Sequence, residues 1–540
     1  MPEVMVQKIC IIGAGSSGLT AIKCCLDENL EPTCFESSDD IGGLWRFKEN
    51  PEDSRASIYK SVIINTSKEM MCFSDYPIPD DFPNYMHNSK IMDYFRMYAN
   101  HFNLLKYIHF KTKVCSIKKR PDFSSTGQWD VVTECDGKLE TGIFDGILVC
   151  SGHHTFPHLP LHAFPGIDKF EGQYLHSRDY KYPQQFADKK IIVIGIGNSG
   201  GDLAVELSSV AKQVFLSTRR GAWVVNRVAD EGFPLDVVLY SRFKLLVKTF
   251  MTTEMLNNWA EKKMNGRFNH ENFGLKPKHR ILSQHPTIND DLPNRIISGK
   301  VIVKPNVKAF TQRDVIFEDG TVEKNIDVVF FATGYSFSFP FFDDPDLKVE
   351  QNHISLYKLV FPPLLEKSTL AFIGLIQPIG AIMPISELQS RWAAQVFKGL
   401  SKLPSSKYML KETSMTKREM ATRYVESPRH TIQVDFMEYM DEIASQFGAK
   451  PSILQYWITD PKLASELFFG PCTPYQYRLM GPNKWSGARK AILTQRERII
   501  KPTKTRICTQ EMNESKSPIT FLLKLAAIFA ILAAAYCAYV

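Results

Sequence analysis

Two glycine-rich loops with the same spacing, "GAGSSG" at residues 13–18 and "GIGNSG" at residues 195–200, constrain the fold of this chain more than any other feature. Each loop follows a short apolar run, "KICII" at 8–12 and "IIVI" at 191–194, and leads into residues that favour a helix. A strand, a G-x-G-x-x-G turn and a helix in this order form the dinucleotide-binding βαβ unit. The sequence therefore predicts an α/β protein with two Rossmann-like dinucleotide-binding domains.

The similarity between the two parts of the chain extends beyond the loops. "FDGILVCSG" at 144–152 resembles "IDVVFFATG" at 326–334, because each has an aspartate, an apolar strand and a small-residue turn that ends in glycine. The separation between Asp145 and Asp327 equals the separation between Gly13 and Gly195. A tandem repeat of one nucleotide-binding unit is the economical explanation.

The two repeats differ at the position that selects the nucleotide. Glu36 follows the expected second strand of the first repeat, where a carboxylate accepts hydrogen bonds from the ribose hydroxyls of FAD or NAD. At the same distance after the second loop stands Thr218, followed by Arg219 and Arg220. Arginine pairs with a 2′-phosphate that a carboxylate would repel. The second site is therefore predicted to bind NADP(H), and FAD, as the hydride acceptor, is expected at the first site.

Composition changes along the chain set the expected domain boundaries. The FAD-binding domain is expected to be discontinuous, with residues 1–157 and 332–445, and a proline-rich stretch marks its first end. The NADP-binding domain is expected at 158–331, with an insertion at about 222–297 that is rich in aromatic and charged residues. A C-terminal extension at 446–517 then leads to a membrane anchor at 518–540.

The last residues differ from all that precede them. From Ile519 to Val540 the chain is apolar except for Lys524, and as a helix this run would extend about 33 Å, which matches a hydrocarbon core of about 30 Å. We expect a single transmembrane helix, with the basic residues before it keeping the body of the protein in the cytosol. A buried C-terminal helix is the alternative.

Charge and cysteine usage exclude several other classes of protein. A net charge of +7 is small for 540 residues and gives no argument for binding nucleic acid. The eleven cysteines form no C-x-x-C pair, so neither a zinc ribbon nor a thioredoxin-type redox pair is indicated, and no metal site is expected.

One further segment carries a resemblance to a known family. "FEGQYLHSRDY" at 170–180 fits the pattern F-x-G-x-x-x-H-x-x-x-[YF] of flavin-containing monooxygenases, and "NTSKEMMCF", "GNSGGDLAVE" and "FATGY" also resemble that family. The resemblance covers essentially the whole chain and is greatest to the mammalian microsomal type. It implies an NADPH- and O2-dependent flavoprotein that forms a C4a-hydroperoxyflavin and oxygenates small lipophilic substrates. It also implies residence in the endoplasmic reticulum membrane.

The resemblance carries over a set of site residues. FAD contacts are expected from Gly13, Ala14, Gly15, Ser16, Ser17, Gly18, Glu36, Gly42, Gly43, Leu44 and Trp45. Residues beside the flavin ring and the nicotinamide are expected to be Ile64, Asn65 and Thr66, with Gln377 as a further contact. NADP contacts are expected from Gly195, Gly197, Asn198, Ser199, Gly200, Gly201, Asp202, Thr218, Arg219 and Arg220. Asn65 is the candidate catalytic residue, because its side-chain amide can donate a hydrogen bond. His176 is expected to fix a turn between the domains.

Several chemistries stay open at this stage. General members of the family oxygenate nitrogen and sulfur nucleophiles, whereas the branch that this sequence resembles most is associated with Baeyer–Villiger insertion into ketones. An NADPH oxidase that releases hydrogen peroxide uses the same cofactors, and a non-catalytic, membrane-tethered redox sensor is a further alternative. A disulfide reductase would need a redox-active cysteine pair that the sequence lacks. A homo-oligomer also stays open.

Overall fold

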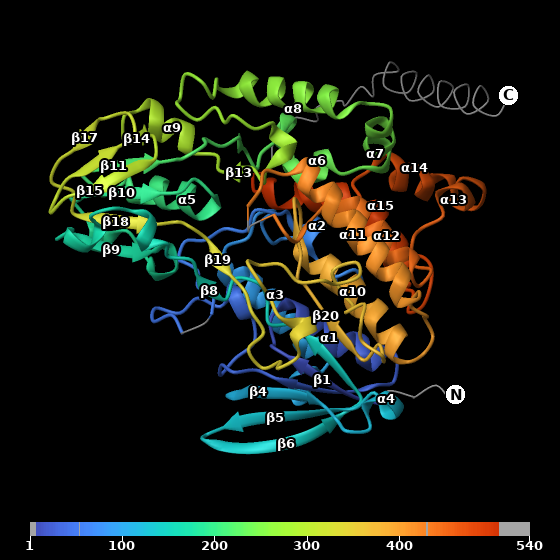
Figure 1. Ribbon diagram of the computed structural model, residues 1–540. Coiled ribbons are helices and arrows are strands. Elements are labelled where there is room, and N and C mark those ends of the chain that lie inside the picture. The colour runs from blue at the N-terminus through green and yellow to red at the C-terminus, as the bar shows by residue number, and fades with distance from the viewer. Residues whose placement is uncertain (1–6, 53–54, 428–429, 507–540) are drawn as a thin grey trace.

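The architecture rests on two five-stranded parallel sheets, which lie apart in the ribbon diagram (Figure 1). The computed structural model describes residues 7–52, 55–427 and 430–506. The first sheet has the order β20-β7-β1-β2-β3 and the second has the order β14-β11-β10-β18-β9. The strands of the first sheet are β1 (Lys8–Ile12), β2 (Glu31–Phe35), β3 (Ile108–His109), β7 (Gly146–Val149) and β20 (Leu370–Phe372). Those of the second are β9 (Gln173–His176), β10 (Lys190–Ile194), β11 (Gln213–Ser217), β14 (Val301–Lys304) and β18 (Val328–Phe331).

The two sheets are built from the same sequence of elements. In the first unit, as we call the first sheet with its helices, β1 leads through α1 (Ser16–Asp27) to its parallel neighbour β2. In the second unit, β10 leads through α5 (Asn198–Leu207) to β11. Each unit then has a three-stranded antiparallel insert, which precedes β7 in the first unit and β18 in the second. The inserts are β4 (Thr112–Lys119), β5 (Trp129–Cys135) and β6 (Lys138–Phe144), and β15 (Val307–Phe310), β16 (Val315–Phe317) and β17 (Val322–Glu323).

The aspartates of the repeated segment have the same structural role in both units. Asp145 accepts a hydrogen bond from the backbone N–H of Lys8, the first residue of β1, at 2.9 Å. Asp327 accepts one from the N–H of Lys190, the first residue of β10, at 2.8 Å. Each aspartate thus ties the start of the strand that precedes the glycine loop to the start of its parallel neighbour. The predicted α/β fold with two Rossmann-like units is confirmed.

Most of the later helices pack on the first unit, around α1. Helix α10 (Ile382–Phe397) packs against α1, and Figure 1 shows the later helices as a layer on the opposite side of the molecule from the second sheet. The other helices are α2 (Lys68–Met71), α3 (Asn88–His101), α4 (Phe123–Thr126), α6 (Leu235–Leu239), α7 (Arg242–Thr249), α8 (Thr253–Arg267), α9 (Leu292–Ile297), α11 (Ser406–Arg423), α12 (Phe436–Ser445), α13 (Ile453–Thr459), α14 (Pro461–Phe469) and α15 (Ala488–Ile500). Short strand pairs complete the fold, namely β8 (Phe156–Pro157) with β19 (Tyr335–Ser336), β12 (Val224–Val225) with β13 (Thr287–Ile288), and β21 (Gln377–Pro378) with β22 (Gln433–Val434).

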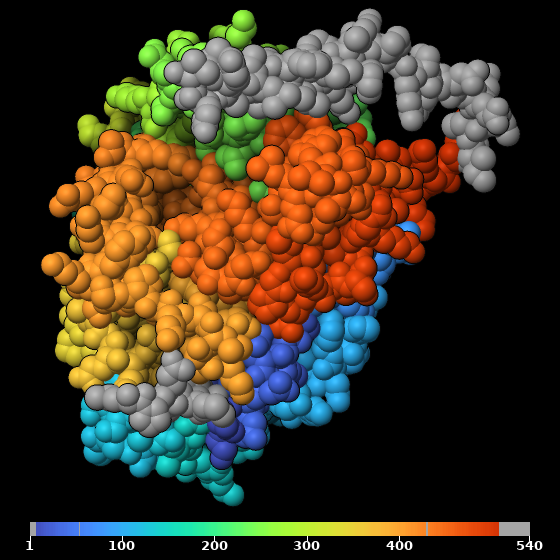
Figure 2. All heavy atoms as spheres, turned by 90° about the vertical axis from the view of Figure 1, so that its right-hand side faces the viewer, coloured from blue at the N-terminus to red at the C-terminus, as the bar shows by residue number. Residues whose placement is uncertain are grey.

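The C-terminal helices are bound to the first unit by buried charges. Arg478 is almost completely buried, and its guanidinium contacts Glu387 of α10 at 2.6 Å and Asp75 at 2.8 Å. From α15, Arg498 pairs with the buried Glu69 of α2 at 2.9 Å. Figure 2 shows these late segments, in orange and red, lying directly against the blue N-terminal part of the chain. Because a buried charge is costly without its partner, these pairs hold the helical layer in one position.

Among the described residues, no helix combines the length and the apolar character that crossing a membrane requires. The segment predicted as an anchor, residues 518–540, lies outside the described residues.

Removing one partner of the buried pair between Arg478 and Glu387 should destabilise the protein strongly. We expect Glu387→Gln to lower the free energy of unfolding by about 3 kcal/mol, because Arg478 loses one of its two carboxylate partners while it stays buried. Urea denaturation followed by fluorescence measures the change. Asp93→Asn is the control, because the exposed Lys90–Asp93 pair should contribute less than about 1 kcal/mol. Equal losses in the two variants would contradict this account.

Candidate functional site

The first glycine loop forms a narrow backbone cradle at the end of β1. Gly13 has a φ of 96°, and a Cβ added there would lie 2.9 Å from the carbonyl oxygen of Cys150 at the end of β7. A Cβ on Gly15 would meet the Cα of Gly43 at 3.6 Å, so the segment 42–45 lies close over the loop. The Gly42 N–H donates to the carbonyl of Ala14 at 3.0 Å. The N-terminus of α1 is therefore surrounded by backbone without side chains, from the loop itself and from residues 42–43. This geometry lets a pyrophosphate approach the backbone N–H groups.

Glu36 lies directly after β2 and is only 2 % exposed. Its carboxylate accepts hydrogen bonds from the backbone N–H groups of Ala14 and Ser38 and from the guanidinium of Arg55, each at 2.8 Å. Burial alone would raise the pKa of this carboxyl, but Arg55 and the two N–H donors hold the pKa below its usual value. Glu36 is thus an anion at neutral pH that also braces the glycine loop, a second role that its spacing in the sequence does not indicate.

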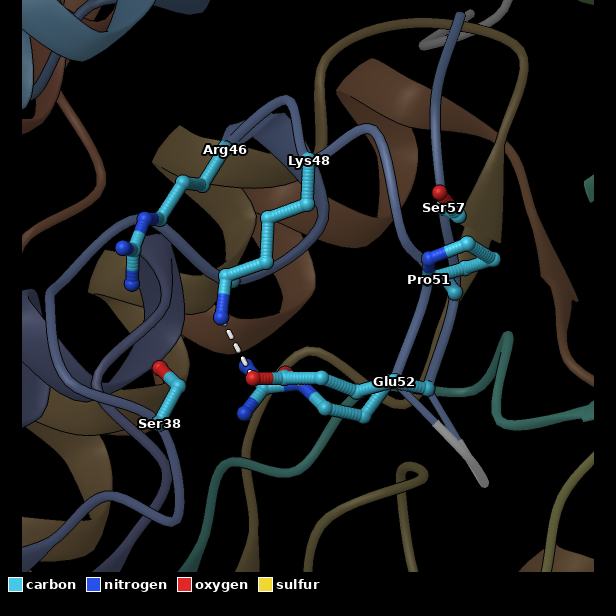
Figure 3. A pocket seen from close by; sticks show the side chains of 9 residues that line it. Ser38, Arg46, Lys48, Pro51, Glu52 and Ser57 are labelled. Carbon is cyan, nitrogen blue, oxygen red and sulfur yellow. Dashed lines mark hydrogen bonds and ion pairs between the residues drawn. The ribbon is translucent and has the colours of Figure 1, made fainter. Parts of the chain in front are cut away.

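A polar pocket opens beside Glu36, and Figure 3 shows its lining. The side chains of Arg46, Lys48, Ser38 and Glu52 line this pocket. The basic groups of this small pocket already form ion pairs with carboxylates, Arg46 with Asp39, Lys48 with Glu52 and Arg55 with Glu36. The backbone cradle and the buried Glu36 carboxylate fit the pyrophosphate and ribose of the dinucleotide expected at the first site.

The second glycine loop has the same geometry at the end of β10. Gly195 has a φ of 106°, and a Cβ on Gly200 would lie only 1.9 Å from the carbonyl oxygen of Gly195. A Cβ on Gly197 would meet nothing within 4 Å, so the loop faces open space at the N-terminus of α5. Gly201 packs against Thr287, and Ser199 lies in the first turn of the helix.

The arginines after β11 are placed to receive a charged group. The Thr218 hydroxyl accepts a hydrogen bond from the N–H of Gly221 at 3.0 Å and closes the turn that carries Arg219 and Arg220. Both arginines are exposed, and within the part of the chain that the structure describes neither has a hydrogen-bond or ion-pair partner. Two unpaired guanidinium groups beside an open glycine loop fit the 2′-phosphate of NADP(H).

The segment from Ile64 to Ser67 lies at the boundary between the two units. The side-chain oxygen of Asn65 accepts a hydrogen bond from Arg227 Nε at 3.0 Å. The N–H of Ser67 donates to the buried carboxylate of Asp236 at 2.7 Å. Ile64 is buried, whereas Asn65 and Thr66 are half-buried. Arg227 and Asp236 come from the insertion at 222–297, so this insertion holds the segment with the candidate catalytic residue.

Asp202 is occupied by contacts within the protein. Its two carboxylate oxygens accept hydrogen bonds from the Tyr59 hydroxyl and from the side-chain amide of Asn289, the latter at 2.8 Å. Burial raises the pKa of the Asp202 carboxyl to about 6, although these two donors act in the opposite direction. Asp202 therefore joins the second loop to Tyr59, which precedes the segment at the boundary.

His176 has the structural role that the sequence analysis expected. Its Nδ1 accepts a hydrogen bond from the Arg178 N–H at 3.2 Å, and its Nε2 lies 3.0 Å from the carbonyl of Gly334. Because Nδ1 accepts, the proton is on Nε2, and the ring links the end of β9 to the turn after β18.

Gln377 lies on β21, which pairs with β22. Its β22 partner Gln433 is buried, and neither polar atom of the Gln433 amide has a hydrogen-bond partner among the described residues. His153 Nε2, in the segment after β7, is also buried and has no hydrogen-bond partner among the described residues. Such groups are rare in native proteins and indicate a polar ligand or water. No pattern in the sequence distinguishes Gln433.

Comparison with known proteins agrees with this geometry. A family model described as flavin-binding monooxygenase-like matches residues 6–540. The chain is 65% identical over 523 residues to the rabbit (Oryctolagus cuniculus) protein named Flavin-containing monooxygenase 5, a match that covers 96% of this chain and 98% of that protein. It is 54% identical over 533 residues to a chimpanzee (Pan troglodytes) protein named Dimethylaniline monooxygenase [N-oxide-forming] 2, with 99% of each chain covered.

Solved structures share the fold at lower sequence identity. The S-allyl-L-cysteine S-oxygenase from Allium sativum superposes with a TM-score of 0.63 at 23% identity, covering 92% of this chain and 99% of that chain.

Proposed function

The chain belongs to the flavin-binding monooxygenase-like family, and from this premise we propose that it uses NADPH and O2 to oxygenate small lipophilic substrates. It is an oxidoreductase that depends on FAD and NADPH. FAD held at the first glycine loop and Glu36 would supply the hydride-accepting and O2-activating chemistry that side chains lack. The protein's own part is to bind both nucleotides, to hold them in one orientation and to exclude water.

One observation carries the assignment of the two sites. The glycine loops are equivalent in geometry, but Glu36 follows the first and Arg219 and Arg220 follow the second. A buried anion and an exposed cation pair select different nucleotides, so the first site takes FAD and the second takes NADPH. Asn65 lies at the boundary between the units, and its amide is the group we propose to donate a hydrogen bond to the reacting cofactors.

The identity of the oxygenated group is a finer proposal. We place Baeyer–Villiger insertion into ketones first, since the sequence resemblance implies it and the chain is more similar to the isoform 5 protein than to the N-oxide-forming relative. Oxygenation of nitrogen or sulfur nucleophiles is the second candidate, which the name of the N-oxide-forming relative supports. Release of hydrogen peroxide instead of product is the alternative outcome for the same cofactors.

We also propose that residues 518–540 anchor the protein in the endoplasmic reticulum membrane, with the catalytic body in the cytosol. The apolar composition of this run and its length support the proposal.

The arginine pair should determine the preference for NADPH over NADH. In the double variant Arg219→Ala and Arg220→Ala we expect the KM for NADPH to rise about a hundredfold, because two charge-assisted contacts to the 2′-phosphate are lost. The KM for NADH should change less than about threefold, since NADH lacks that phosphate. Steady-state kinetics with both nucleotides measures the effect, and an equal rise in both KM values would refute the phosphate assignment.

Product analysis decides between the two oxygenation chemistries. Purified holoenzyme is supplied with NADPH, O2 and either a long-chain methyl ketone or an alkyl aryl thioether, and the products are identified by mass spectrometry. We expect the ester from the ketone at a higher kcat/KM than the sulfoxide from the thioether. Sulfoxide alone would favour the second candidate, and peroxide without either product would contradict the proposed oxygenase activity.

Deletion of residues 518–540 tests the anchor. We expect the full-length chain to sediment with microsomal membranes and to stay there in alkaline carbonate, and the truncated chain to appear in the supernatant with its flavin. Membrane binding of the truncated chain that resists carbonate would show that this segment is not the anchor.

A further inference from the structure

The orientation of the Asn65 amide is fixed by the residue it contacts. Its Oδ1 lies 3.0 Å from Arg227 Nε. A guanidinium group carries only donors, so the amide oxygen must face Arg227, and the amide NH2 must point elsewhere. Asn65 is therefore held in the one orientation that leaves its donor available to a ligand.

Arg227 is itself held in place on three sides. Its Nη1 forms an ion pair with Asp290 at 3.1 Å, and its own N–H donates to the same carboxylate at 3.1 Å. Its carbonyl accepts a hydrogen bond from the Tyr85 hydroxyl at 2.6 Å. The Arg227 side chain is 16 % exposed, so these contacts are screened from bulk water and are stronger than those of a surface pair.

The residues before Asp290 contact the second glycine loop. The N–H of Ile288 donates to the side-chain oxygen of Asn198, the first residue of α5, at 2.8 Å. The amide of Asn289 donates to Asp202, also on α5, at 2.8 Å. Figure 1 shows β13, which ends at Ile288, between the second sheet and α6. A continuous chain of contacts thus runs from the second nucleotide site through residues 288–290 and Arg227 to Asn65.

We propose that Arg227 and Asp290 are positioning residues that orient the Asn65 amide and couple it to occupancy of the second nucleotide site. This inference rests on the proposed function, in which that site takes NADP(H) and Asn65 faces the cofactors. A nucleotide that contacts the N-terminus of α5 favours one position of Asn198 and of residues 288–290. The linkage is reciprocal, so loss of the Arg227–Asn65 contact must also weaken nucleotide binding if the coupling exists.

The direct test substitutes Arg227 with methionine, which keeps much of the side-chain volume and removes all side-chain donors. We expect Arg227→Met to weaken binding of NADP⁺ to the oxidised flavin-loaded enzyme about tenfold, the scale of one lost charge-assisted hydrogen bond. The dissociation constant is measured by the flavin absorbance change on titration with NADP⁺. In turnover, the hydrogen peroxide released per NADPH oxidised should rise, because the amide is free to rotate.

A double-mutant cycle separates positioning from an independent role. If Arg227 acts through Asn65, then Asn65→Ala with Arg227→Met should release no more peroxide per NADPH than Asn65→Ala alone. Asp290→Asn, which keeps the shape of the partner and removes its charge, should move both readouts in the same direction by a smaller factor. Additive effects in the cycle, or wild-type affinity for NADP⁺ in Arg227→Met, would overturn the proposal.

A matched control tests whether the loss of any contact between the units has the same effect. Tyr59→Phe removes the hydroxyl that Asp202 accepts from and leaves the Arg227–Asn65 contact in place. It should therefore change the peroxide yield less than Arg227→Met does, at comparable flavin content and thermal midpoint. Equal effects of the two variants would show that Arg227 only helps to hold the units together and does not specifically orient Asn65. Failure of the wild-type enzyme to oxidise NADPH would instead refute the proposed function.

Discussion

The contact between the two nucleotide-binding units is the constraint on which the rest of the structure depends. Each unit forms its own parallel sheet and its own glycine loop, and either loop alone could hold a nucleotide. Hydride transfer requires the two nucleotides to meet at fixed distance and angle, because orientation supplies much of the rate. Polar contacts across the boundary set that relation, among them those of Asn65 with Arg227, Ser67 with Asp236 and Tyr59 with Asp202. Buried ion pairs from the C-terminal helices then fix the first unit from its other side, through Glu69 and Glu387.

Repetition and divergence have separate physical roles in this chain. The repeated features, such as the strand-tying aspartates Asp145 and Asp327, are those that a parallel sheet with a tight strand-to-helix turn requires. The divergent features lie where ligand chemistry differs. After β2 the chain places a buried carboxylate, and after β11 it places two exposed guanidinium groups. The fold is thus used twice, and the two copies differ in charge directly after the second strand, where we propose that the nucleotide is selected.

The parts of this site that the sequence could predict are those encoded within one βαβ unit. The glycine spacing, Glu36 and the arginine pair all lie within a short stretch of chain, so their register can be counted. Arg227 and Asp236 could not be predicted, because their partners Asn65 and Ser67 lie 162 and 169 residues away in the sequence. Arg55 lies only 19 residues after Glu36, but no periodic pattern marks it. The insertion at 222–297 shows no clear apolar periodicity either. Some of its residues, such as Arg227 and Asp236, contact the first unit, and others, such as Val224 and Leu275, pack into the core of the second. The predicted anchor at 518–540 stays a prediction.

We propose that two different nucleotides occupy the equivalent loops and that a hydride passes between them across the boundary. Anaerobic titration of the purified, flavin-loaded protein with NADPH tests it most directly. We expect about one equivalent of NADPH per flavin to bleach the flavin absorbance band, as for a two-electron donor held beside its acceptor. NADH at the same concentration should bleach it far more slowly. Flavin that stays oxidised in excess NADPH, or that is reduced equally well by NADH, would contradict the account.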